Sequence, residues 1–320
     1  MVRFAVRRIL LMLVVLFVIS IVVFGLFYAR PGNPARSLAG RQASAQQVAL
    51  VAHRLGLDQP VLIRYRHFAG RLFLHADLGT DFQNGESVRS ELLQRLPTTA
   101  SLTGGAVVLW LLAGIPIGVQ AATRPRSARD RMATFFALVG LSMPTFVLGL
   151  LALYALYFLL TRAGIPLFPG GGYVPLTQDP LQWFRHLLLP WFTLAFVTAA
   201  TYSRLTRGSL IDTLNEDYIR TARSKGLPER RVIYRHGMRT AVTPVLTQLG
   251  IDIGTLLGGA IVVETIFSLN GIGKFAVDSV FSDDQPVIVG TVLLGTAFIV
   301  VANAVVDMLY AVLDPRVRLS

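Results

Sequence analysis

Long apolar stretches alternate with short charged segments along this sequence. About six of them reach the roughly 20 residues that a helix needs to cross the hydrocarbon core of a bilayer. We therefore expect an all-α membrane protein with about six transmembrane helices. The stretches are residues 9–28 and those between Arg95 and Arg124, Arg131 and Arg162, Arg185 and Arg204, Arg239 and Glu264, and Asp284 and Asp307.

The composition supports this interpretation. Hydrophobic residues make up 53% of the 320 residues and charged residues 15%, against about 25% charged residues in soluble domains. The net charge of +12 alone is compatible with nucleic acid or an anionic membrane as a partner. Its distribution favours the membrane, because Lys and Arg collect in the short segments that are cytoplasmic if the N-terminus is cytoplasmic. We expect both termini in the cytoplasm and no nucleic-acid partner.

The pattern divides the chain into four parts. Residues 1–30 form an N-terminal transmembrane helix, which we expect to be retained because its apolar run exceeds a usual signal-peptide core and Tyr28-Ala29-Arg30-Pro31 is a poor cleavage site. Residues 31–96 form an extracytoplasmic insertion, residues 97–312 the transmembrane core, and residues 313–320 a cytoplasmic tail.

The insertion has a pattern of its own. Turn residues occupy 31–34, a helix is predicted over 43–55 with Ser44 as its N-cap, and a second helix over 61–73. The insertion is either a packed cap on the outer surface or a docking site for an external partner, and the sequence alone favours the packed cap.

The longest cytoplasmic loop, residues 204–243, predicts a short helix over 216–225. Asn215 is suited to be its N-cap, Gly226 suits a left-handed position after its end, and Pro228 suits the start of a second helix. A helix of about ten residues is marginal alone, so it needs a surface to pack on. Ile219 and Ala222 share a face with Gly226, and the small residues there favour close approach to a partner.

The order of residues in this loop resembles a known family. Residues 216–227, Glu-Asp-Tyr-Ile-Arg-Thr-Ala-Arg-Ser-Lys-Gly-Leu, are similar to the loop that marks permeases of binding-protein-dependent ABC importers, in its dipeptide and oligopeptide B-type form. Further matches follow in order along nearly the whole chain. They lie at residues 30–34, 55–58, 236–244, 258, 264–273, 307–310 and 314–316.

The resemblance implies the type I ABC importer fold and a set of partners in the bacterial inner membrane. These are a second permease subunit, two ABC ATPase subunits and an extracytoplasmic peptide-binding protein, with di- or oligopeptides as cargo. It also implies that the short helix couples to an ATPase. The residues expected to do so are Glu216, Asp217, Tyr218, Ile219, Thr221, Ala222, Arg223, Lys225 and Gly226.

The chain is not expected to be an enzyme or to hold a cofactor. It has no cysteine and no phosphate-binding Gly-x-x-x-x-Gly-Lys-Ser/Thr sequence, so ATP and Mg²⁺ would be bound by the partner ATPases. The five histidines lack the spacing of metal ligands, so no metal site is expected.

Polar residues inside the predicted spans are candidates for the translocation path, because ionisable groups there are costly. We expect Asp252 and Asn303 to line the path, whereas Asp307 lies near the cytoplasmic end, where a structural role fits better. Two alternatives remain open. One is the same architecture with nickel or glutathione as cargo, and the other is an ion-coupled secondary transporter, for which the intramembrane acids are few.

Overall fold

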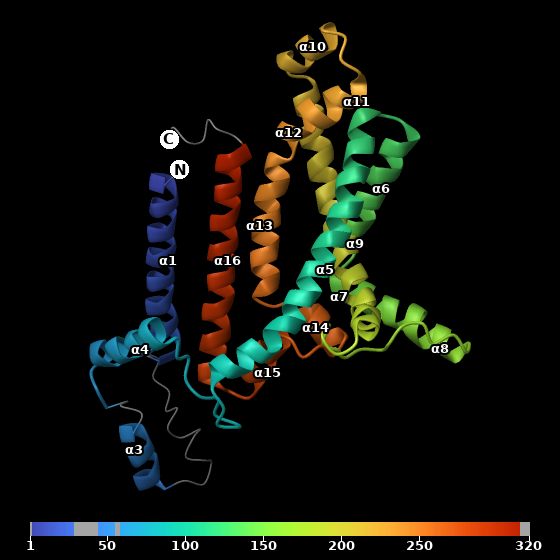
Figure 1. Cartoon of the computed structure of the whole chain (residues 1–320). Helices are drawn as coiled ribbons and strands as arrows, with labels where there is room; N and C mark the ends of the chain where they lie inside the picture. Colours follow the sequence, from blue (N-terminus) through green and yellow to red (C-terminus); the bar gives the residue numbers. More distant parts are fainter. Residues whose placement is uncertain (1, 29–43, 55–57, 314–320) are drawn as a thin grey trace.

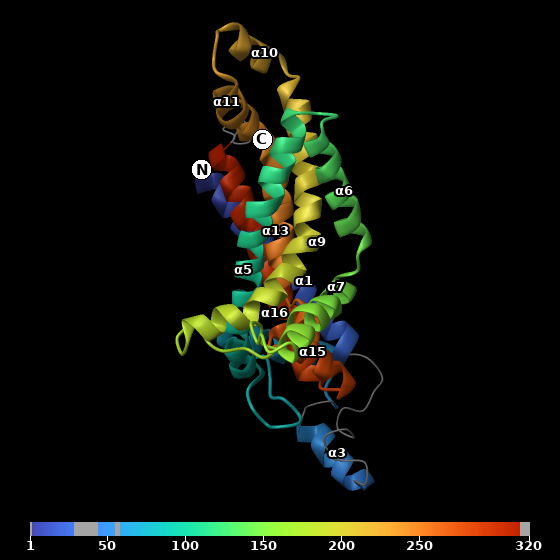
Figure 2. The ribbon, with the colours of Figure 1, turned by 90° about the vertical axis from the view of Figure 1, so that its right-hand side faces the viewer.

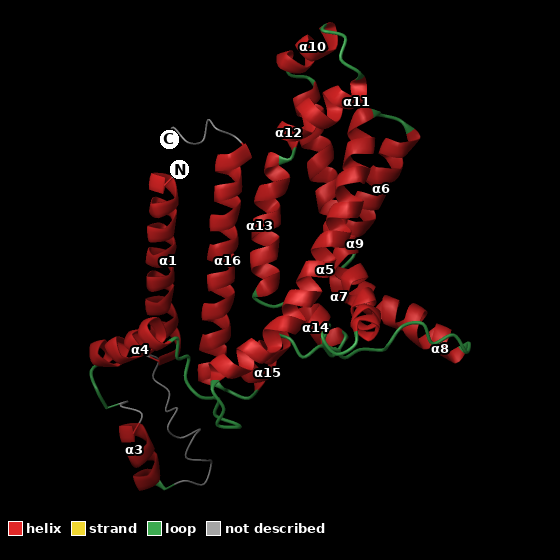
Figure 3. Cartoon of the chain, in the orientation of Figure 1, coloured by secondary structure: helices red, strands yellow, loops and turns green. Residues whose placement is uncertain are grey.

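The computed structural model describes residues 2–28, 44–54 and 58–313. In this part the chain consists of helices joined by loops, as Figure 3 shows. The expected turn at 31–34, both ends of the first insertion helix (Ala43 and Leu55) and tail residues 314–320 lie outside it. The elements are α1 (Val2–Tyr28), α3 (Ala45–Arg54), α4 (Val61–His75), α5 (Val88–Thr123), α6 (Ala128–Ser142), α7 (Thr145–Ala152), the π-helical η1 (Leu153–Leu159), α8 (Leu160–Arg162), α9 (Pro180–Leu214), α10 (Asp217–Ser224), α11 (Glu229–Arg231), the π-helical η2 (Val232–Gly237), α12 (Met238–Ala241), α13 (Thr243–Leu257), α14 (Ile261–Ile266), α15 (Ile272–Phe281) and α16 (Gln285–Leu313).

Four described helices are long and apolar enough to cross a membrane: Val6–Phe27, Val88–Thr123, Thr145–Arg162 and Gln285–Val306. A fifth span results if the segments on either side of the 50° bend between α12 and α13 count as one. The remaining predicted stretch, the fourth, lies within α9. There, hydroxyl-bearing residues such as Thr193 and Ser203 interrupt the apolar sequence, and both are buried among neighbouring helices.

The third predicted stretch is divided into two helices. α6 ends at Ser142, Met143 and Pro144 are extended, and α7 begins at Thr145. The residue before a proline disfavours the helical conformation, which explains the break. The helix that resumes continues through η1 and α8 to Arg162.

The centre of the molecule is the pair α5 and α9, which run side by side (Figures 1 and 2). Trp110 of α5 and Tyr202 of α9 are fully buried, with ring centroids 5.8 Å apart. α6 packs on the outer side of α9, and α13, α16 and α1 stand roughly parallel to one another beside this group (Figure 1). α1 begins and α16 ends at the end of the molecule that carries α10, in agreement with the predicted orientation.

Glycines allow α13 to lie close to α16. Gly250, Gly254 and Gly258 recur every fourth residue along one face of the α13 segment. A Cβ atom on Gly254 would lie 2.7 Å from the Cα of Ile299, and one on Gly258 would lie 3.1 Å from the Cα of Gly295. Small residues at this spacing are the usual means by which membrane helices approach closely.

The insertion forms both predicted helices. In α3, Ser44 Oγ accepts a hydrogen bond from Gln47 N and Gln47 Oε1 accepts one from Ser44 N, so Ser44 caps the helix as expected. α4 covers the predicted 61–73 and extends to His75. It packs across α1 near the end opposite to α10 (Figure 1).

Candidate coupling loop and translocation path

α10 is a short helix with a well-defined end. Gly226 has φ +74°, its N–H donates to the carbonyl of Arg223 at 2.9 Å, and the N–H of Leu227 donates to the carbonyl of Ala222 at 3.4 Å. These two bonds form a Schellman motif, which requires a left-handed residue after the C-cap. The predicted place of Gly226 in the helix end is therefore confirmed.

The start of α10 differs from the prediction. Asn215 ends α9 and its Nδ2 donates to the carbonyl of Ile211, so it is not the N-cap of α10. Glu216 occupies that position without a side-chain capping bond. The asparagine was equally suited to end the preceding helix, and the 35-residue α9 reaches it.

The small face of α10 is turned toward its own chain. Ile219 is fully buried and Ala222 is 7% exposed, and both pack with Val232 of η2, with Leu214 and Leu227 beside them. The expectation that this face meets a partner is thus corrected. The burial is the surface that the short helix needs, and the loop supplies it itself.

Polar contacts fasten α10 to its neighbours. Arg223 donates to both carboxylate oxygens of Glu229, at 2.8 and 3.3 Å, and also to the carbonyl of Leu214. These bonds lower the pKa of the Glu229 carboxyl and raise that of the Arg223 guanidinium. Tyr218 Oη and Thr240 Oγ1 of α12 share a further bond of 3.1 Å. α10 is therefore connected to α9, α11 and α12.

The opposite face of α10 is exposed at the far end of the molecule (Figure 1). The side chains of Asp217 and Arg220 are 95% and 70% exposed, although they form a pair at 3.3 Å. Sequence reasoning did not include Arg220 among the coupling residues, yet it is central to this outward face. The other predicted residues that are exposed are Glu216, Tyr218, Thr221, Arg223, Lys225 and Gly226.

The two candidates for the translocation path lie apart. Asp252 is half-buried, with Oδ2 accepting from Tyr202 Oη at 2.8 Å and Oδ1 accepting from Gln248 Nε2 at 2.9 Å. It therefore faces α9, whereas α13 contacts α16 through the opposite, glycine-lined face. Asn303 is exposed on α16, and the side chain of Asp307 lies outside the described part of the chain.

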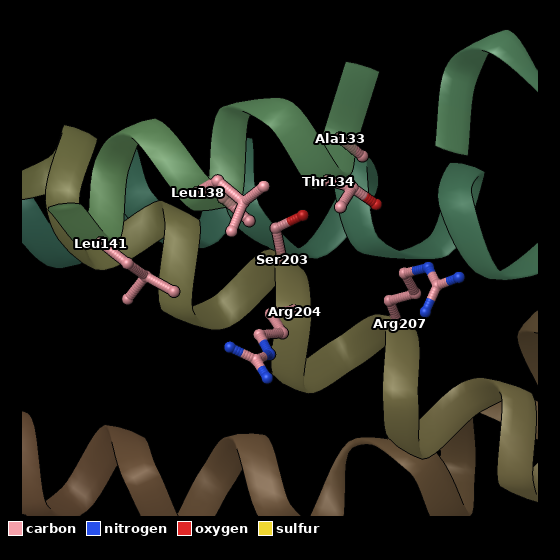
Figure 4. A pocket seen from close by; sticks show the side chains of 8 residues that line it. Ala133, Thr134, Leu138, Leu141, Ser203, Arg204 and Arg207 are labelled. Carbon is pink, nitrogen blue, oxygen red and sulfur yellow. The ribbon is translucent and has the colours of Figure 1, made fainter. Parts of the chain in front are cut away.

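An ion pair between the buried Asp130 and the half-buried Arg207 joins the predicted cytoplasmic ends of α6 and α9. Arg207 Nε and Nη2 donate to the two carboxylate oxygens of Asp130, the second bond at 3.1 Å, and the backbone N–H of Arg126 donates to Asp130 as well. The guanidinium of Arg207 holds the pKa of the Asp130 carboxyl below its usual range. Arg207 also borders a pocket between the two helices, which Figure 4 shows with Leu138, Leu141 and Ser203 on its walls.

We predict that Asp130→Asn lowers the stability of the folded chain by about 1–2 kcal/mol, because an amide cannot accept both guanidinium bonds. The readout is the temperature at which half of the purified complex stays monodisperse. Because the folded-state pKa of Asp130 is lowered, the contribution of the pair is present at neutral pH and is lost only as the pH falls below about 4. Asp212→Asn changes an exposed acid near the same end of α9 and is the matched control. Equal melting of both variants would contradict the prediction.

A second buried carboxyl group organises the opposite end of the molecule. Glu264 of α14 is fully buried, and it accepts hydrogen bonds from Thr99 Oγ1 of α5 at 2.8 Å and from the backbone N–H of Lys274 at 2.9 Å. Thr99 Oγ1 in turn accepts from the backbone N–H of Ile272 at 2.9 Å. One carboxyl group thus holds the start of α15 against α5.

The sequence around Glu264 is shaped to fit this carboxyl group. A Cβ atom on Gly271 would collide with it, so only glycine leaves it enough room. Gly259 and Gly273 approach each other backbone to backbone in the same way. The family resemblance covers residues 264–273, but a role for Glu264 was not predicted, because nothing in the sequence pairs it with Thr99.

Comparison with known proteins gives consistent matches over the whole length. Residues 114–319 match the family described as binding-protein-dependent transport system inner membrane component, and residues 1–103 match the family of the N-terminal part of such components. The chain is 38% identical over 318 residues to the glutathione transport system permease protein GsiC of Salmonella typhimurium, covering 99% of each chain. It is 37% identical, with the same coverage, to the protein of that name from Escherichia coli strain K12.

Proposed function

We propose a function that follows from the family, since this chain belongs to the binding-protein-dependent transport system inner membrane components. It forms half of the path for short peptides, and it couples that path to ATP hydrolysis through α10. The family makes it a multi-pass inner-membrane permease subunit of an ABC importer.

The observation that carries the coupling proposal is the two-sided environment of α10. One face is fixed on the chain's own loop by Ile219 and Ala222, and the other presents Asp217, Arg220 and Thr221 to solvent. A helix that is rigidly seated and exposed at the far end of α9 is suited to transmit a push from a partner into the membrane helices. We infer that an ATPase subunit binds this outer face.

The expected assembly contains a second permease subunit, two ATPase subunits that bind ATP and Mg²⁺, and an extracytoplasmic binding protein that delivers cargo. Alternating access would follow from rocking of the helix bundles about the path between the two permeases. In this chain α5, α9 and α13 would move with α10, because Arg223 and Tyr218 connect α10 to α9, α11 and α12.

Two cargoes are in question, and both are small peptides. The family resemblance favours di- and oligopeptides. The relatives from Salmonella typhimurium and Escherichia coli are named for glutathione, which is itself a tripeptide. We propose short peptides as the cargo class, with glutathione as the specific alternative. The half-buried carboxylate of Asp252 is suited to meet the amino group that both share.

We predict that the complete complex in liposomes hydrolyses ATP faster when its binding protein is loaded with cargo. The cargoes to compare are a dipeptide, a pentapeptide and glutathione, each tested by stimulated hydrolysis and by uptake of the labelled compound. Stimulation by the peptides supports the first cargo, and stimulation by glutathione alone selects the alternative. If no ATPase co-purifies, or none of the three compounds is taken up, the proposal is wrong.

A further inference from the structure

α9 has a polar side that faces away from α5. Where the two helices pack, a Cβ atom on Gly118 would lie 2.7 Å from the Cβ of Thr206. Residues two or five positions from Thr206 are about half a turn away from it. Thr201, Arg204 and Gly208 therefore lie on the opposite side, where Arg204 is exposed and the other two are half-buried. We call this the open side of α9.

α13 has an open side of the same kind. Thr247, Ile251 and Thr255 are exposed and recur every fourth residue. They lie between the glycine-lined face that packs on α16 and the position of Asp252, which faces α9. The side that carries Val245 is buried in the core next to α5. The open sides of α9 and α13 therefore both turn away from α5.

These two sides differ from the helix surfaces that suit lipid. Exposed side chains of α1 and α7, such as Ile21, Phe146 and Leu150, are large and apolar. The open sides of α9 and α13 carry hydroxyl groups and an arginine instead. Lipid chains offer no hydrogen-bond partner to such groups, so polar sides at membrane depth border a water-filled path or another protein.

Arg204 lies below the predicted cytoplasmic surface of the membrane. A Cβ atom on Gly118 would lie 2.6 Å from the carbonyl oxygen of Ser203, so the neighbouring Arg204 is level with Gly118. The span formed by α5 continues for five residues beyond this level, to Thr123, which is about 7.5 Å. An ionisable side chain at such a depth almost always faces a water-filled cavity or a charged partner.

The guanidinium of Arg204 is available to a ligand. Among the described residues, Arg204 has neither a hydrogen-bond nor an ion-pair partner, whereas Arg207 is held by Asp130. Arg204 borders the pocket of about 240 Å³ between α6 and α9, whose α6 wall includes Leu138 and Leu141 (Figure 4). The pocket thus combines an unpaired guanidinium with apolar walls, which suits a carboxylate attached to an apolar group.

Asp252 supplies the opposite charge on the neighbouring helix. Its carboxylate accepts bonds from Tyr202 and Gln248, and no cation pairs with it in the part of the chain that the structure describes. A peptide at neutral pH carries a charged amino group at one end and a carboxylate at the other. Arg204 on α9 and Asp252 on α13 therefore match the charges at the two ends of such a cargo.

We propose, on the basis of the function proposed above, that the open sides of α9 and α13 form this chain's wall of the translocation path, and that Arg204 binds the terminal carboxylate of a peptide cargo there. The planar guanidinium can form two parallel bonds with a carboxylate. The apolar pocket beside it takes the last side chain of the peptide, between Leu138 and Leu141. Thr201 lies about one turn before Arg204 on the same side, so it reports on this subsite.

The wall can be mapped by labelling, since the chain contains no cysteine. Thr201→Cys, Thr247→Cys and Leu150→Cys are made singly in the complete, nucleotide-free complex in lipid nanodiscs, with reactive cysteines of the partner subunits replaced. A charged methanethiosulfonate reacts with ionised thiols, which form in water and not in lipid. We expect the two threonine positions to react at least about tenfold faster than the control. The control, Leu150, is 54% exposed within an apolar span.

The preference for a carboxylate is tested on the same complexes. Alanyl-leucine at high concentration should slow the labelling of Thr201→Cys at least about twofold, because it binds within one helical turn of that position. Alanyl-leucine amide lacks the carboxylate and should not slow it. Addition of Arg204→Gln should abolish the protection. Arg131→Gln changes an exposed arginine outside the pocket and should preserve it.

Transport gives an independent measurement. In liposomes with the binding protein, Arg204→Gln is expected to lower uptake of the cargo that the wild type imports at least about tenfold, which corresponds to a loss of about 1.4 kcal/mol. Its melting temperature should be unchanged, because the exposed guanidinium has no partner among the described residues. Arg131→Gln should transport at close to the wild-type rate.

The outcomes separate this subsite from the function on which it rests. Slow labelling at both threonine positions would mean that lipid or protein covers the open sides. Protection by the amide, no protection by alanyl-leucine, or full uptake by Arg204→Gln would mean that Arg204 does not bind the carboxylate. Each of these results overturns the proposal. Labelling needs neither ATP nor the binding protein, so a wild-type complex that labels as expected but imports no peptide would contradict only the proposed function.

Discussion

Replacing Glu264 with alanine is expected to lower the stability of the folded chain by about 3 kcal/mol, the largest effect we predict for a single side chain outside the coupling loop. The substitution leaves the hydroxyl of Thr99 and the N–H of Lys274 buried without their acceptor. Each unpaired buried donor costs about 1–3 kcal/mol. A cavity also opens where the fully buried side chain had been.

The measurement is the temperature at which half of the purified complex remains monodisperse, and a loss of about 4–5 °C is expected for a chain of this length. Glu264→Gln keeps the shape of the side chain and one acceptor oxygen, so its melting temperature should lie between those of the wild type and Glu264→Ala. Asp278→Ala removes a carboxylate that pairs with Lys274 at 3.1 Å but is 59% exposed, so it should cost little. If Glu264→Ala melts like Asp278→Ala, Glu264 does not hold α15 against α5.

The architecture could be predicted because apolar length and charge placement are local properties. The sixth apolar stretch was predicted between two acids, and α16 begins at Gln285, directly after Asp284, although it runs on past Asp307 to Leu313. Gly226 and Pro228 likewise marked the end of α10 and the start of α11, because a positive φ and a missing N–H each suit few positions. The structure departs from the predicted spans where a single residue changes the backbone, as at Pro144, where an otherwise continuous apolar stretch is divided into two helices.

The contacts between distant residues could not be predicted in this way. Glu264 and Thr99 are separated by 165 positions, and Arg207 and Asp130 by 77, so no local pattern connects them. The direction of the small face of α10 was also undetermined. A pattern shows that Ile219 and Ala222 share a face, but it does not show whether Val232 of the same chain or a second protein covers them. In this loop the chain covers that face itself.

If residues 204–243 couple transport to an ATPase as proposed, α10 must be firmly held, and polar contacts connect it to its neighbours. Arg223 and Glu229 are 41% and 55% exposed, so their attraction is screened and contributes about 1 kcal/mol or less to stability. Their paired bonds nevertheless fix the angle between α10 and α11. The apolar cluster of Ile219, Ala222 and Val232 fixes the distance between the same elements. Displacement of the outer face should therefore move α9 and α12 along with it.

Substitutions at two neighbouring positions of α10 should therefore reduce transport to a similar extent, but for different reasons. Ile219→Asp puts a charge into the apolar cluster with Val232, so α10 is expected to detach and become sensitive to limited proteolysis. Arg220→Glu alters a side chain that is 70% exposed, so it should leave the melting temperature and protease resistance unchanged. If the outer face binds an ATPase, cargo-stimulated hydrolysis should still fall at least about tenfold, which a loss of about 1.4 kcal/mol produces.

Comparing the two variants distinguishes the packing of α10 on its own chain from the binding of its outer face to an ATPase. Arg230→Glu makes the same charge change on an exposed residue of α11, outside the outer face of α10, and should retain most of the stimulated activity. A fully active Arg220→Glu complex would mean that the outer face of α10 is not where the ATPase binds. A protease-resistant Ile219→Asp chain would mean that the apolar cluster does not hold the helix. Because the two faces of one eight-residue helix have opposite surroundings, each outcome identifies which of them is required for coupling.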